Sequence, residues 1–258
     1  MGKVALVTGA GRGAGRGVAR ELARAGYAVV VADLDPLTAA DAAEEVRALG
    51  AAGSVAVCDV SDEVAVAAMF EQIREEHGDV DVLVNTVAWI DPQATIAEMP
   101  TEVWHRSFRV NVDSVFFTTR AALPGMMARG RGVIVNFSSL NGTRGFPERG
   151  SYSASKAAVI TLTQTTAMEG RRHGIRAYAL VPGGIDGERV RELRARLADQ
   201  PRQPRPPELG AVPELMDPDW IGRYVAFLAS EEGRHLNGQA LVIGEAARTP
   251  LQAIYPDL

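Results

Sequence analysis

The stretch from residue 3 to residue 33 constrains the fold more than any other part of the chain. An apolar run at residues 4–7 leads into a turn rich in glycine, Thr8-Gly9-Ala10-Gly11-Arg12-Gly13-Ala14-Gly15. A segment with apolar residues at helical spacing follows and stops at Gly26, and a second apolar run over residues 27–32 ends on Asp33. This order predicts a strand, a glycine turn, a helix and a second strand that ends on an acid.

The glycines of this turn suit a dinucleotide cofactor. A helix N-terminus offers unpaired N–H groups and the positive end of a dipole, which favour a pyrophosphate that can come close. Gly9, Gly13 and Gly15 have no side chain to block that approach. Asp33 stands where a carboxylate accepts hydrogen bonds from the adenosine ribose and repels a 2'-phosphate. Arg12 could attract a 2'-phosphate, but Asp33 lies nearer the ribose edge, so we expect NAD rather than NADP. A structural turn without a ligand is the alternative.

The rest of the chain alternates strand and helix patterns without a long linker. Further strands are expected at residues 54–57, 80–84, 133–137, 175–181 and 240–243, and further helices at residues 37–49, 61–77, 101–122, 152–172 and 220–230. Ser61 and Thr101 are the expected N-caps of two of these helices. With 258 residues, 47% of them hydrophobic, the chain can bury a substantial core. The sequence predicts one α/β domain over residues 1–258, a Rossmann-type doubly wound parallel sheet of about seven strands with helices on both faces.

Charge and cysteine content argue against several classes of protein. The net charge of −5 and the pI near 5.5 argue against nucleic acid or an anionic membrane as the main partner. No apolar run approaches the length of a membrane span and the strand pattern begins at once, so we expect a cytoplasmic protein. Cys58 is the only cysteine and the four histidines have no ligand spacing, so neither a disulfide nor a metal site is expected.

Tyr152 and Lys156 are the candidate acid/base pair. They lie four residues apart in a predicted helix, so both side chains project from one face. Tyrosine alone is a poor base at neutral pH because its reference pKa is about 10. A neighbouring ammonium favours the phenolate and lowers that pKa by about 1 to 3 units. Lysine is also compact enough to reach a ribose hydroxyl. Since Lys3 and Lys156 are the only lysines, such a pair rarely arises by chance.

Three further polar positions are candidates for the site. Ser139 follows a predicted strand and can hydrogen-bond a substrate oxygen, although a serine in a turn is more often structural. Asn111 lies in an apolar helix pattern, where it has either buried partners or a place on a solvated face, because burying an unpaired amide is costly. Asp59 and Val60 follow the strand at residues 54–57, at the edge where open parallel sheets bind ligands.

Residues 186–218 differ in character from the rest of the chain. Arginines mixed with acids, and clustered prolines, mark this segment: Arg189, Arg191, Arg194, Arg196, Arg202, Arg205, Pro201, Pro204, Pro206 and Pro207. We interpret it as a lid over a substrate site. A polyproline ligand for an SH3-like partner and a loop without fixed structure are the alternatives.

Taken together, these residues resemble the short-chain dehydrogenase/reductase family over nearly the whole chain. The turn from Thr8 to Gly15 matches the family's cofactor motif, and Tyr152-x-x-x-Lys156 matches its active-site pair. Ser139 precedes Tyr152 by thirteen residues, as the family's serine does. Asn111, Asp59 and Asn85 match the helix asparagine of the family's catalytic tetrad, its adenine contact and the first residue of its Asn-Asn-Ala-Gly motif.

The resemblance implies a role for each of these residues. Tyr152 would exchange a proton with the substrate oxygen while Ser139 holds that oxygen. Lys156 would bind the nicotinamide ribose and tune Tyr152, and Asn111 would hold a water that links Lys156 to solvent. The cofactor contacts implied are Gly9, Arg12, Gly13, Ala14, Asp33, Leu34, Asp59, Val60, Asn85, Thr86, Val87, Tyr152, Lys156, Pro182, Gly183 and Ile185. A homotetramer packed partly through the helices that carry Asn111 and Tyr152 is also implied.

The sequence departs from the family pattern at three places. Asn85-Thr86-Val87-Ala88 replaces most of the Asn-Asn-Ala-Gly motif and adds bulk under the nicotinamide ribose. Gly187 stands where a threonine is expected near the carboxamide, which leaves backbone groups around Ile185 to hold it. Val242-Ile243-Gly244-Glu245 stands where Val-Asp-Gly-Gly is frequent. These departures bear on nicotinamide binding and leave the proton-transfer residues in place.

The expected function is an NAD(H)-dependent oxidoreductase that interconverts a secondary alcohol and a ketone. A substrate pocket lined by Trp89, Leu140, Phe146 and Met216 favours an apolar, cyclic small molecule, although the aromatic residues could instead belong to the core or an interface. Inward-facing lid arginines would favour an acidic substrate. An NADP-dependent ketoreductase and a dinucleotide-sensing protein without turnover are the alternatives.

Overall fold

Seven parallel strands form one sheet in the order β3-β2-β1-β4-β5-β6-β7. The computed structural model describes residues 2–188, 191 and 215–244. The strands are β1 Val4–Thr8, β2 Ala28–Asp33, β3 Gly53–Val57, β4 Val82–Asn85, β5 Gly132–Phe137, β6 Ile175–Pro182 and β7 Ala240–Ile243. The central strands are continuous buried runs of valine, leucine and isoleucine because helices cover both faces of the sheet. The predicted doubly wound fold is therefore confirmed.

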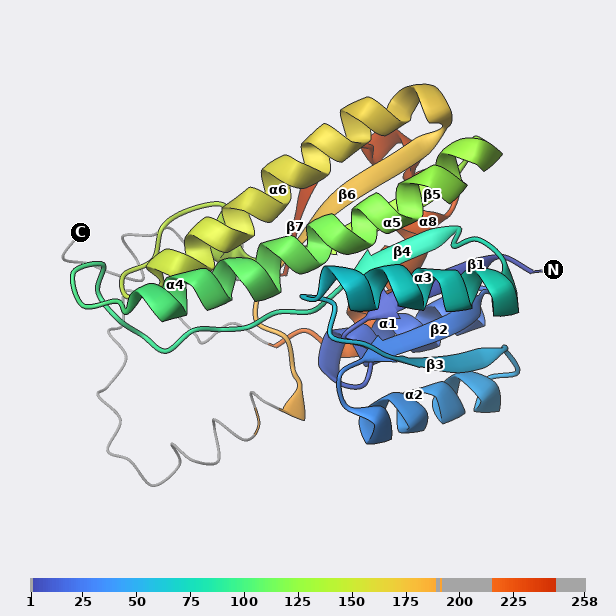
Figure 1. Cartoon of the computed structure of the whole chain (residues 1–258), viewed down its shortest axis with the longest axis horizontal. Coiled ribbons are helices and arrows are strands. Elements are labelled where there is room, and N and C mark those ends of the chain that lie inside the picture. Colours follow the sequence, from blue (N-terminus) through green and yellow to red (C-terminus); the bar gives the residue numbers. More distant parts are fainter. Residues whose placement is uncertain (1, 189–190, 192–214, 245–258) are drawn as a thin grey trace.

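Helices cover both faces of this sheet (Figure 1). One face carries α1 Gly13–Arg24, α2 Pro36–Ala48 and α8 Pro218–Ala229, and the other carries α3 Glu63–His77, α5 Ser114–Arg129 and α6 Gly150–Gly170. A further helix, α4 Thr101–Phe108, packs against α6. Short helical turns complete the described chain: η1 Arg109–Asp113, η2 Leu140–Gly142, η3 Arg171–His173 and η5 Glu232–Leu236. Each face buries its own apolar cluster against the sheet.

The strand order reverses between β1 and β4. The chain winds outward from β1 through β2 to β3, then returns and winds the other way from β4 to β7. The loops that leave β1 and β4 therefore part in opposite directions and open a crevice at the carboxyl ends of these strands. Several predicted cofactor residues and Ser139 lie at or just after strand ends at this edge, which is where the fold positions a site.

Two of the predicted helix starts are wrong. Ser61 does not cap α3; the carboxylate of Asp62 does, accepting hydrogen bonds from the N–H groups of Val64 at 2.8 Å and Ala65 at 3.2 Å. Thr101 is the first residue of α4, and Pro100 precedes it as the cap without a side-chain hydrogen bond. A carboxylate accepts two N–H groups more strongly than a hydroxyl does, which favours Asp62.

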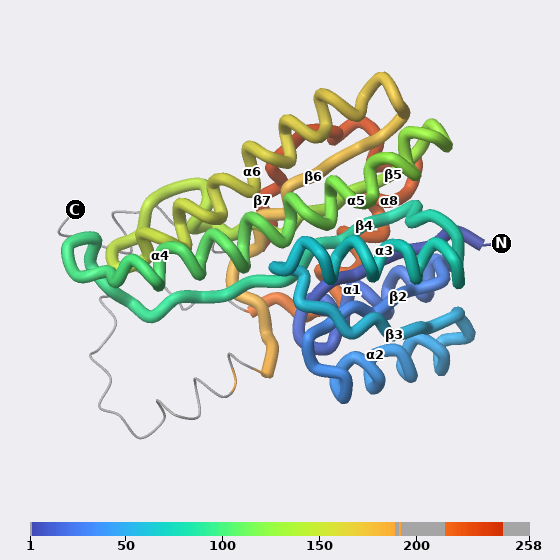
Figure 2. The backbone as a smooth tube through the Cα atoms, viewed as in Figure 1, coloured from blue at the N-terminus to red at the C-terminus, as the bar shows by residue number. Residues whose placement is uncertain are grey.

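The helix predicted over residues 101–122 is longer and is not uniform. Figure 2 shows α4, η1 and α5 running on as one rod beside α6. The middle turn, η1, is a π-helix that contains Asn111. Such turns insert one extra residue into the helix and occur often at functional sites.

Most of the segment interpreted as a lid lies outside the described residues, because residues 189–190 and 192–214 are not among them. Its two ends meet: the N–H of Asp186 donates to the carbonyl of Met216 at 2.9 Å, and the N–H of Met216 donates to the carbonyl of Gly184 at 2.8 Å. The lid interpretation itself stays a prediction. Within the described part of the chain, no helix has both the length and the apolar character needed to cross a membrane.

Candidate active site

The glycine turn between β1 and α1 is shaped to bring its backbone close to a ligand. Gly9 and Gly13 have φ angles of +67° and +53°, which favour glycine. A Cβ atom at Gly15 would collide with the carbonyl oxygen of Gly9 and would lie 2.6 Å from the hydroxyl of Thr86. A Cβ atom at Gly13 would meet nothing within 4 Å, so that side of the turn is open. No side chain caps α1 and its first turn holds no acid, so its N–H groups and dipole fit a pyrophosphate.

Asp33, at the end of β2, is held by the backbone of two neighbouring turns. One carboxylate oxygen accepts from the N–H of Gly11 at 2.9 Å and the other from the N–H of Asp35 at 3.2 Å. Arg12 lies beside it, with its guanidinium 3.4 Å from the carboxylate of Asp35. The charge of Arg12, which could attract a 2'-phosphate, is thus partly balanced by Asp35, although the pair is exposed and therefore weak.

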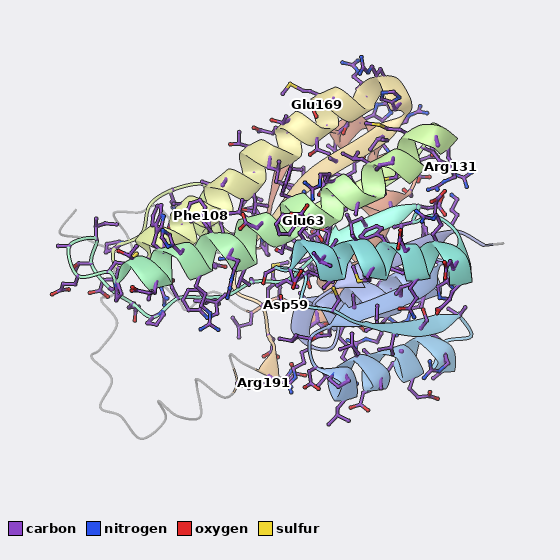
Figure 3. All side chains as sticks on the ribbon, viewed as in Figure 1. Asp59, Glu63, Phe108, Arg131, Glu169 and Arg191 are labelled. Atoms are coloured by element: carbon purple, nitrogen blue, oxygen red, sulfur yellow. The ribbon has the colours of Figure 1, made fainter. Side chains whose placement is uncertain are left out.

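A cleft of about 690 Å³ opens at this edge of the sheet. Its walls include nine of the sixteen residues expected to bind the cofactor, namely Gly9, Arg12, Gly13, Asp33, Leu34, Asp59, Val60, Thr86 and Val87. Figure 3 shows Asp59 at this carboxyl edge and Arg131 at the opposite edge. Of the described residues, Ala14, Asn85, Tyr152, Lys156, Pro182, Gly183 and Ile185 do not line this cleft. Gly187 reaches over the glycine turn: a Cβ atom on it would lie 3.6 Å from the Cα of Gly13.

The side chain of Asn85 is used inside the protein. Its amide oxygen accepts from the hydroxyls of Thr118 at 2.9 Å and Thr8 at 3.3 Å, and its nitrogen donates to Asn136 at 2.9 Å. Asn136 in turn donates to Thr163 of α6 at 2.9 Å. These buried groups join three strands to α5 and α6, so a cofactor contact of Asn85 would use its backbone. Asn136 was not predicted as part of the site, although it lies in β5 at the position that pairs with Asn85.

Thr86, which replaces the family's second asparagine, fastens the glycine turn. Its hydroxyl donates to the carbonyl of Thr8 at 2.7 Å and lies 3.3 Å from that of Gly9. Val87 packs beside it, with a methyl 3.0 Å from where a Cβ atom of Gly9 would lie. The added bulk therefore rests against the cofactor turn and holds its shape.

Lys156 is sealed inside the protein on the same helix as Tyr152. Its Nζ donates to the carbonyl of Phe137, the last residue of β5, at 2.8 Å and lies 6.0 Å from the ring centre of Tyr152. The described residues offer it no carboxylate partner within an ion-pair distance. Burial lowers the pKa of Lys156 to about 8. Tyr152 itself is half-buried, so the predicted pair is brought together with the phenol nearer to solvent.

The loop that carries Ser139 is fastened to this pair. The hydroxyl of Ser138 donates to the carbonyl of Lys156 at 2.8 Å, and a Cβ atom at Gly142 would lie 2.7 Å from that carbonyl. Ser139 precedes η2 as its N-cap, and its Oγ accepts from the N–H of Asn141 at 3.3 Å. The strand end, the loop and the α6 turn that bears Lys156 are therefore one unit. Ser138 was missed because the pattern of two adjacent serines does not show which one faces the helix.

Asn111 is buried with partners, which resolves the alternatives left open by the sequence. Its amide oxygen accepts from the N–H of Trp89 at 2.7 Å, and its nitrogen donates to the carbonyl of Trp89 at 3.0 Å and to Ser155 at 3.0 Å. The π-turn thus links the loop after β4 to the residue next to Lys156.

The expected substrate-pocket residues lie in different environments. Trp89 lines the cleft, and the guanidinium of Arg106 stands 4.7 Å from its ring centre. Phe146 is stacked by Arg144 at 5.1 Å, and Leu140 is half-buried in η2. Met216 was predicted to line the substrate pocket, and this prediction is wrong because its side chain is buried in the hydrophobic core.

The segment after β6 is tied to β7 and to Met216. The N–H of Gly183, which follows Pro182, donates to the carbonyl of Ile243 at 2.9 Å, and Ile185 forms a bridge with Met216. Gly244 has a φ angle of +96°, which favours glycine. The first glycine of the family's Val-Asp-Gly-Gly pattern is therefore still needed, although the residues on either side of it differ. Ala14 is partly buried against the same core cluster.

Other reactive side chains in the described part of the chain have no arrangement for chemistry. Burial raises the pKa of the Cys58 thiol to about 11, so this cysteine stays protonated beside the cleft. Among residues 2–188, 191 and 215–244, no three or more histidine, cysteine, aspartate or glutamate side chains gather as a metal site would require.

Comparison with known proteins places this geometry in a family. The family model for short chain dehydrogenases matches residues 3–198. The chain is 37% identical over 247 residues to cis-4-hydroxycyclohexanecarboxylate dehydrogenase of Sinomonas cyclohexanicum, covering 93% of this chain and 94% of that protein.

Solved structures agree with this match. A crystal structure of NAD+-bound xylitol dehydrogenase superposes with a TM-score of 0.85 at 30% identity, covering 94% of this chain and 97% of that one. A gluconate 5-dehydrogenase from Burkholderia cenocepacia J2315 in complex with NADP and tartrate superposes with a TM-score of 0.84 at 33% identity, covering 95% and 94%. The chain therefore belongs to the short-chain dehydrogenase/reductase family and is a nicotinamide-dependent oxidoreductase that acts on CH–OH groups.

Proposed function

We propose that the protein is an NAD(H)-dependent oxidoreductase that interconverts a secondary alcohol and a ketone on a small, cyclic or largely apolar molecule. The observation that carries this proposal is the pairing of Tyr152 with the buried Lys156, whose Nζ is fixed 2.8 Å from the carbonyl of Phe137. A lysine in such a place is costly to bury. The cost of burying Lys156 is explained if its ammonium acts on the neighbouring phenol of Tyr152.

Each residue has one task in this reaction. Gly9, Gly13, Asp33 and the N-terminus of α1 would hold the dinucleotide, which when bound supplies a carbon that accepts or donates a hydride. Tyr152, as phenolate, would take the proton from the substrate's hydroxyl oxygen as the carbon that bears this oxygen loses its hydride. In reduction Tyr152 returns that proton to the carbonyl oxygen, and Ser139 donates a hydrogen bond to this oxygen in both directions.

Lys156 and Asn111 support Tyr152. The Lys156 ammonium would stabilise the phenolate through the low-dielectric interior and would bind a ribose hydroxyl of the cofactor as well. Asn111 is proposed to hold a water that returns the proton to solvent. Its side chain is already engaged with Trp89 and Ser155, so this water would bind the backbone of the π-turn, where the ordinary helical hydrogen bonds are interrupted.

The preference for NAD rests on charge at the end of β2. Asp33 would meet a 2'-phosphate with like charge, and the guanidinium of Arg12 is drawn to Asp35. An NADP-dependent ketoreductase is the alternative, and of the two solved structures named above one holds NAD+ and the other NADP. Comparing the Michaelis constants for NADH and NADPH separates the two.

A small cyclic or largely apolar secondary alcohol is the proposed substrate class. The wall of the cleft carries Trp89 with a stacked guanidinium, which suits a ring. The relatives named above act on a hydroxycyclohexane acid and on xylitol. Cyclohexanol, cis-4-hydroxycyclohexanecarboxylate, xylitol and sorbitol, each with NAD, form a first panel, read by absorbance of the reduced cofactor. A flat trace across the panel and its ketones, with NAD binding shown by calorimetry, would favour the sensor without turnover.

We also propose a homotetramer in the cytoplasm. Large apolar side chains are exposed on α8 and β7, namely Trp220, Tyr224, Phe227 and Val242, and Phe116 and Met168 are exposed on α5 and α6. Apolar faces of this kind mark surfaces between subunits. A single buried cysteine fits a reducing compartment.

A further inference from the structure

A buried carboxylate stands behind Tyr152. Asp91 lies in the loop between β4 and α4, and its side chain is fully buried. One of its oxygens accepts from the backbone N–H of Tyr152 at 3.2 Å and from the hydroxyl of Ser151. Asp91 therefore holds the first turn of α6, the helix that carries both Tyr152 and Lys156.

This cap differs from the caps of the other helices. Asp35, Asp62 and Asp217 each cap the helix that begins one residue later in the chain. Arg149 precedes α6 and offers no side-chain cap. The acceptor comes instead from a loop some sixty residues earlier. An exposed aspartate directly before α6 would cap this helix at less cost in desolvation. Asp91, which lies far from α6 in the sequence, also joins the loop after β4 to the first turn of α6.

The loop of Asp91 is fixed at several points. Arg149 returns the contact, with its guanidinium donating to the backbone carbonyl of Asp91 at 2.8 Å and lying 3.7 Å from its carboxylate. The N–H of Ala94 donates to the carbonyl of Glu148 at 3.3 Å. Two residues before Asp91, Trp89 is clamped by the amide of Asn111. The loop is therefore a short strut between the π-turn and the start of α6.

The same loop forms a wall of the cofactor cleft through Val87, Ala88 and Trp89. A group that ties this wall to the backbone of Tyr152 fixes the phenol relative to whatever lies in the cleft. Proton transfer depends steeply on such placement, because a misplacement of about 1 Å can cost about a hundredfold in rate.

We propose that Asp91 is a positioning residue, which sets the place of Tyr152 relative to the cofactor cleft by joining the loop after β4 to the first turn of α6. The inference rests on the proposed function of Tyr152 as proton donor. Asp91 acts through Tyr152 and touches neither substrate nor cofactor.

Two variants of Asp91 and one matched control test this role. Asp91→Ala removes the acceptor. Asp91→Asn removes the charge but keeps an oxygen that accepts from the N–H of Tyr152. Asp62→Ala removes a capping carboxylate from α3, which carries no catalytic residue. Turnover is measured with the best alcohol of the panel at saturation and with NAD varied up to saturation, which gives both kcat and the KM for NAD. Hydrogen exchange of the peptide spanning residues 150–156 is measured in the same proteins without substrate.

The expected result is a loss specific to kcat. Asp91→Ala lowers kcat at least about tenfold, leaves the KM for NAD within about twofold and speeds exchange at the Tyr152 amide. Asp91→Asn restores most of kcat. Asp62→Ala loses stability with kcat unchanged.

Either of two results overturns the inference: Asp91→Ala retains wild-type kcat, or exchange at the Tyr152 amide is the same as in wild type. The exchange measurement decides the matter even where no alcohol of the panel turns over. Full turnover by Tyr152→Phe would instead contradict the proposed role of Tyr152 as proton donor. The exchange measurement on Asp91→Ala would still show whether Asp91 holds the Tyr152 backbone.

Discussion

At the scale of single residues, the proposed preference for NAD depends on the charge of Asp33. Asp33→Asn keeps one of the two accepting oxygens, replaces the other with an amide NH2 group and removes the charge that would repel a 2'-phosphate. We expect the ratio of kcat/KM for NADPH to that for NADH to rise by about tenfold or more, since one removed like-charge contact is worth about 1 to 2 kcal/mol. Arg12→Ala is the control. Because Arg12 is paired with Asp35 and exposed, its removal should change the ratio far less. An unchanged ratio in Asp33→Asn would place the specificity elsewhere.

Lys156 gives the protein a dependence of stability on pH. Burial lowers its folded pKa to about 8, whereas the unfolded chain holds the proton up to its ordinary pKa of about 10.5. Between these values the unfolded state binds more protons, so the contribution of Lys156 to stability rises with pH. Comparing urea unfolding of wild type and Lys156→Met at pH 8 and pH 10 isolates this contribution. The difference should shift by about 2 kcal/mol in favour of wild type, and an equal difference at both pH values would contradict the buried, cofactor-free state of Lys156.

At the scale of elements, a chain of buried amides and hydroxyls fastens the sheet to the catalytic helix. Asn136→Ala leaves the amide nitrogen of Asn85 and the hydroxyl of Thr163 without their partner. We expect the free energy of unfolding to fall by about 2 to 4 kcal/mol. Thr161→Ala is the control, because the Thr161 hydroxyl makes only a 3.5 Å contact in an exposed position. A loss no larger than that of the control would show that the network adds no stability.

The elements themselves were largely predictable because their signals are local. The seven strands were predicted from short apolar runs, and the fold class follows from their alternation with helices. The cap of α3 was misassigned because Ser61 and Asp62 are both good caps, and only the backbone shows which residue is last outside the helix. The π-turn at Asn111 was not predicted, since its extra residue is held by Trp89 and Ser155 from distant parts of the chain.

The site was predictable only as far as its motifs are contiguous. The turn from Gly9 to Gly15 and the pair of Tyr152 and Lys156 each lie within eight residues, so spacing alone indicated them. Partners such as Ser138, Asn136 and Asp91 were missed, because each acts on a residue 18 to 61 positions away. Met216 was assigned to the substrate pocket because it lies near the end of the segment interpreted as a lid, residues 186–218. In the structure its backbone forms a bridge with Ile185, and its side chain is buried in the core.

At the scale of the whole molecule, the exposed apolar surface of α8 and β7 bears on assembly. If this face joins two copies, a charge at its centre should separate them, because a buried unpaired charge is costly. We expect Phe227→Glu to halve the mass measured by light scattering. Val64→Glu, on the exposed side of α3, is the matched control and should leave the mass unchanged. A wild-type monomer, or an unchanged mass in Phe227→Glu, would contradict this role of the face.

The most direct measurement concerns Tyr152, since the whole account depends on a phenol that carries the proton beside a buried ammonium. Tyr152→Phe removes one oxygen and leaves the ring, the helix and the glycine turn in place. With NAD and the best alcohol of the panel, turnover should fall below detection while the Kd for NADH, measured by fluorescence, stays within about twofold of wild type. Turnover near the wild-type rate with normal cofactor binding would contradict the account.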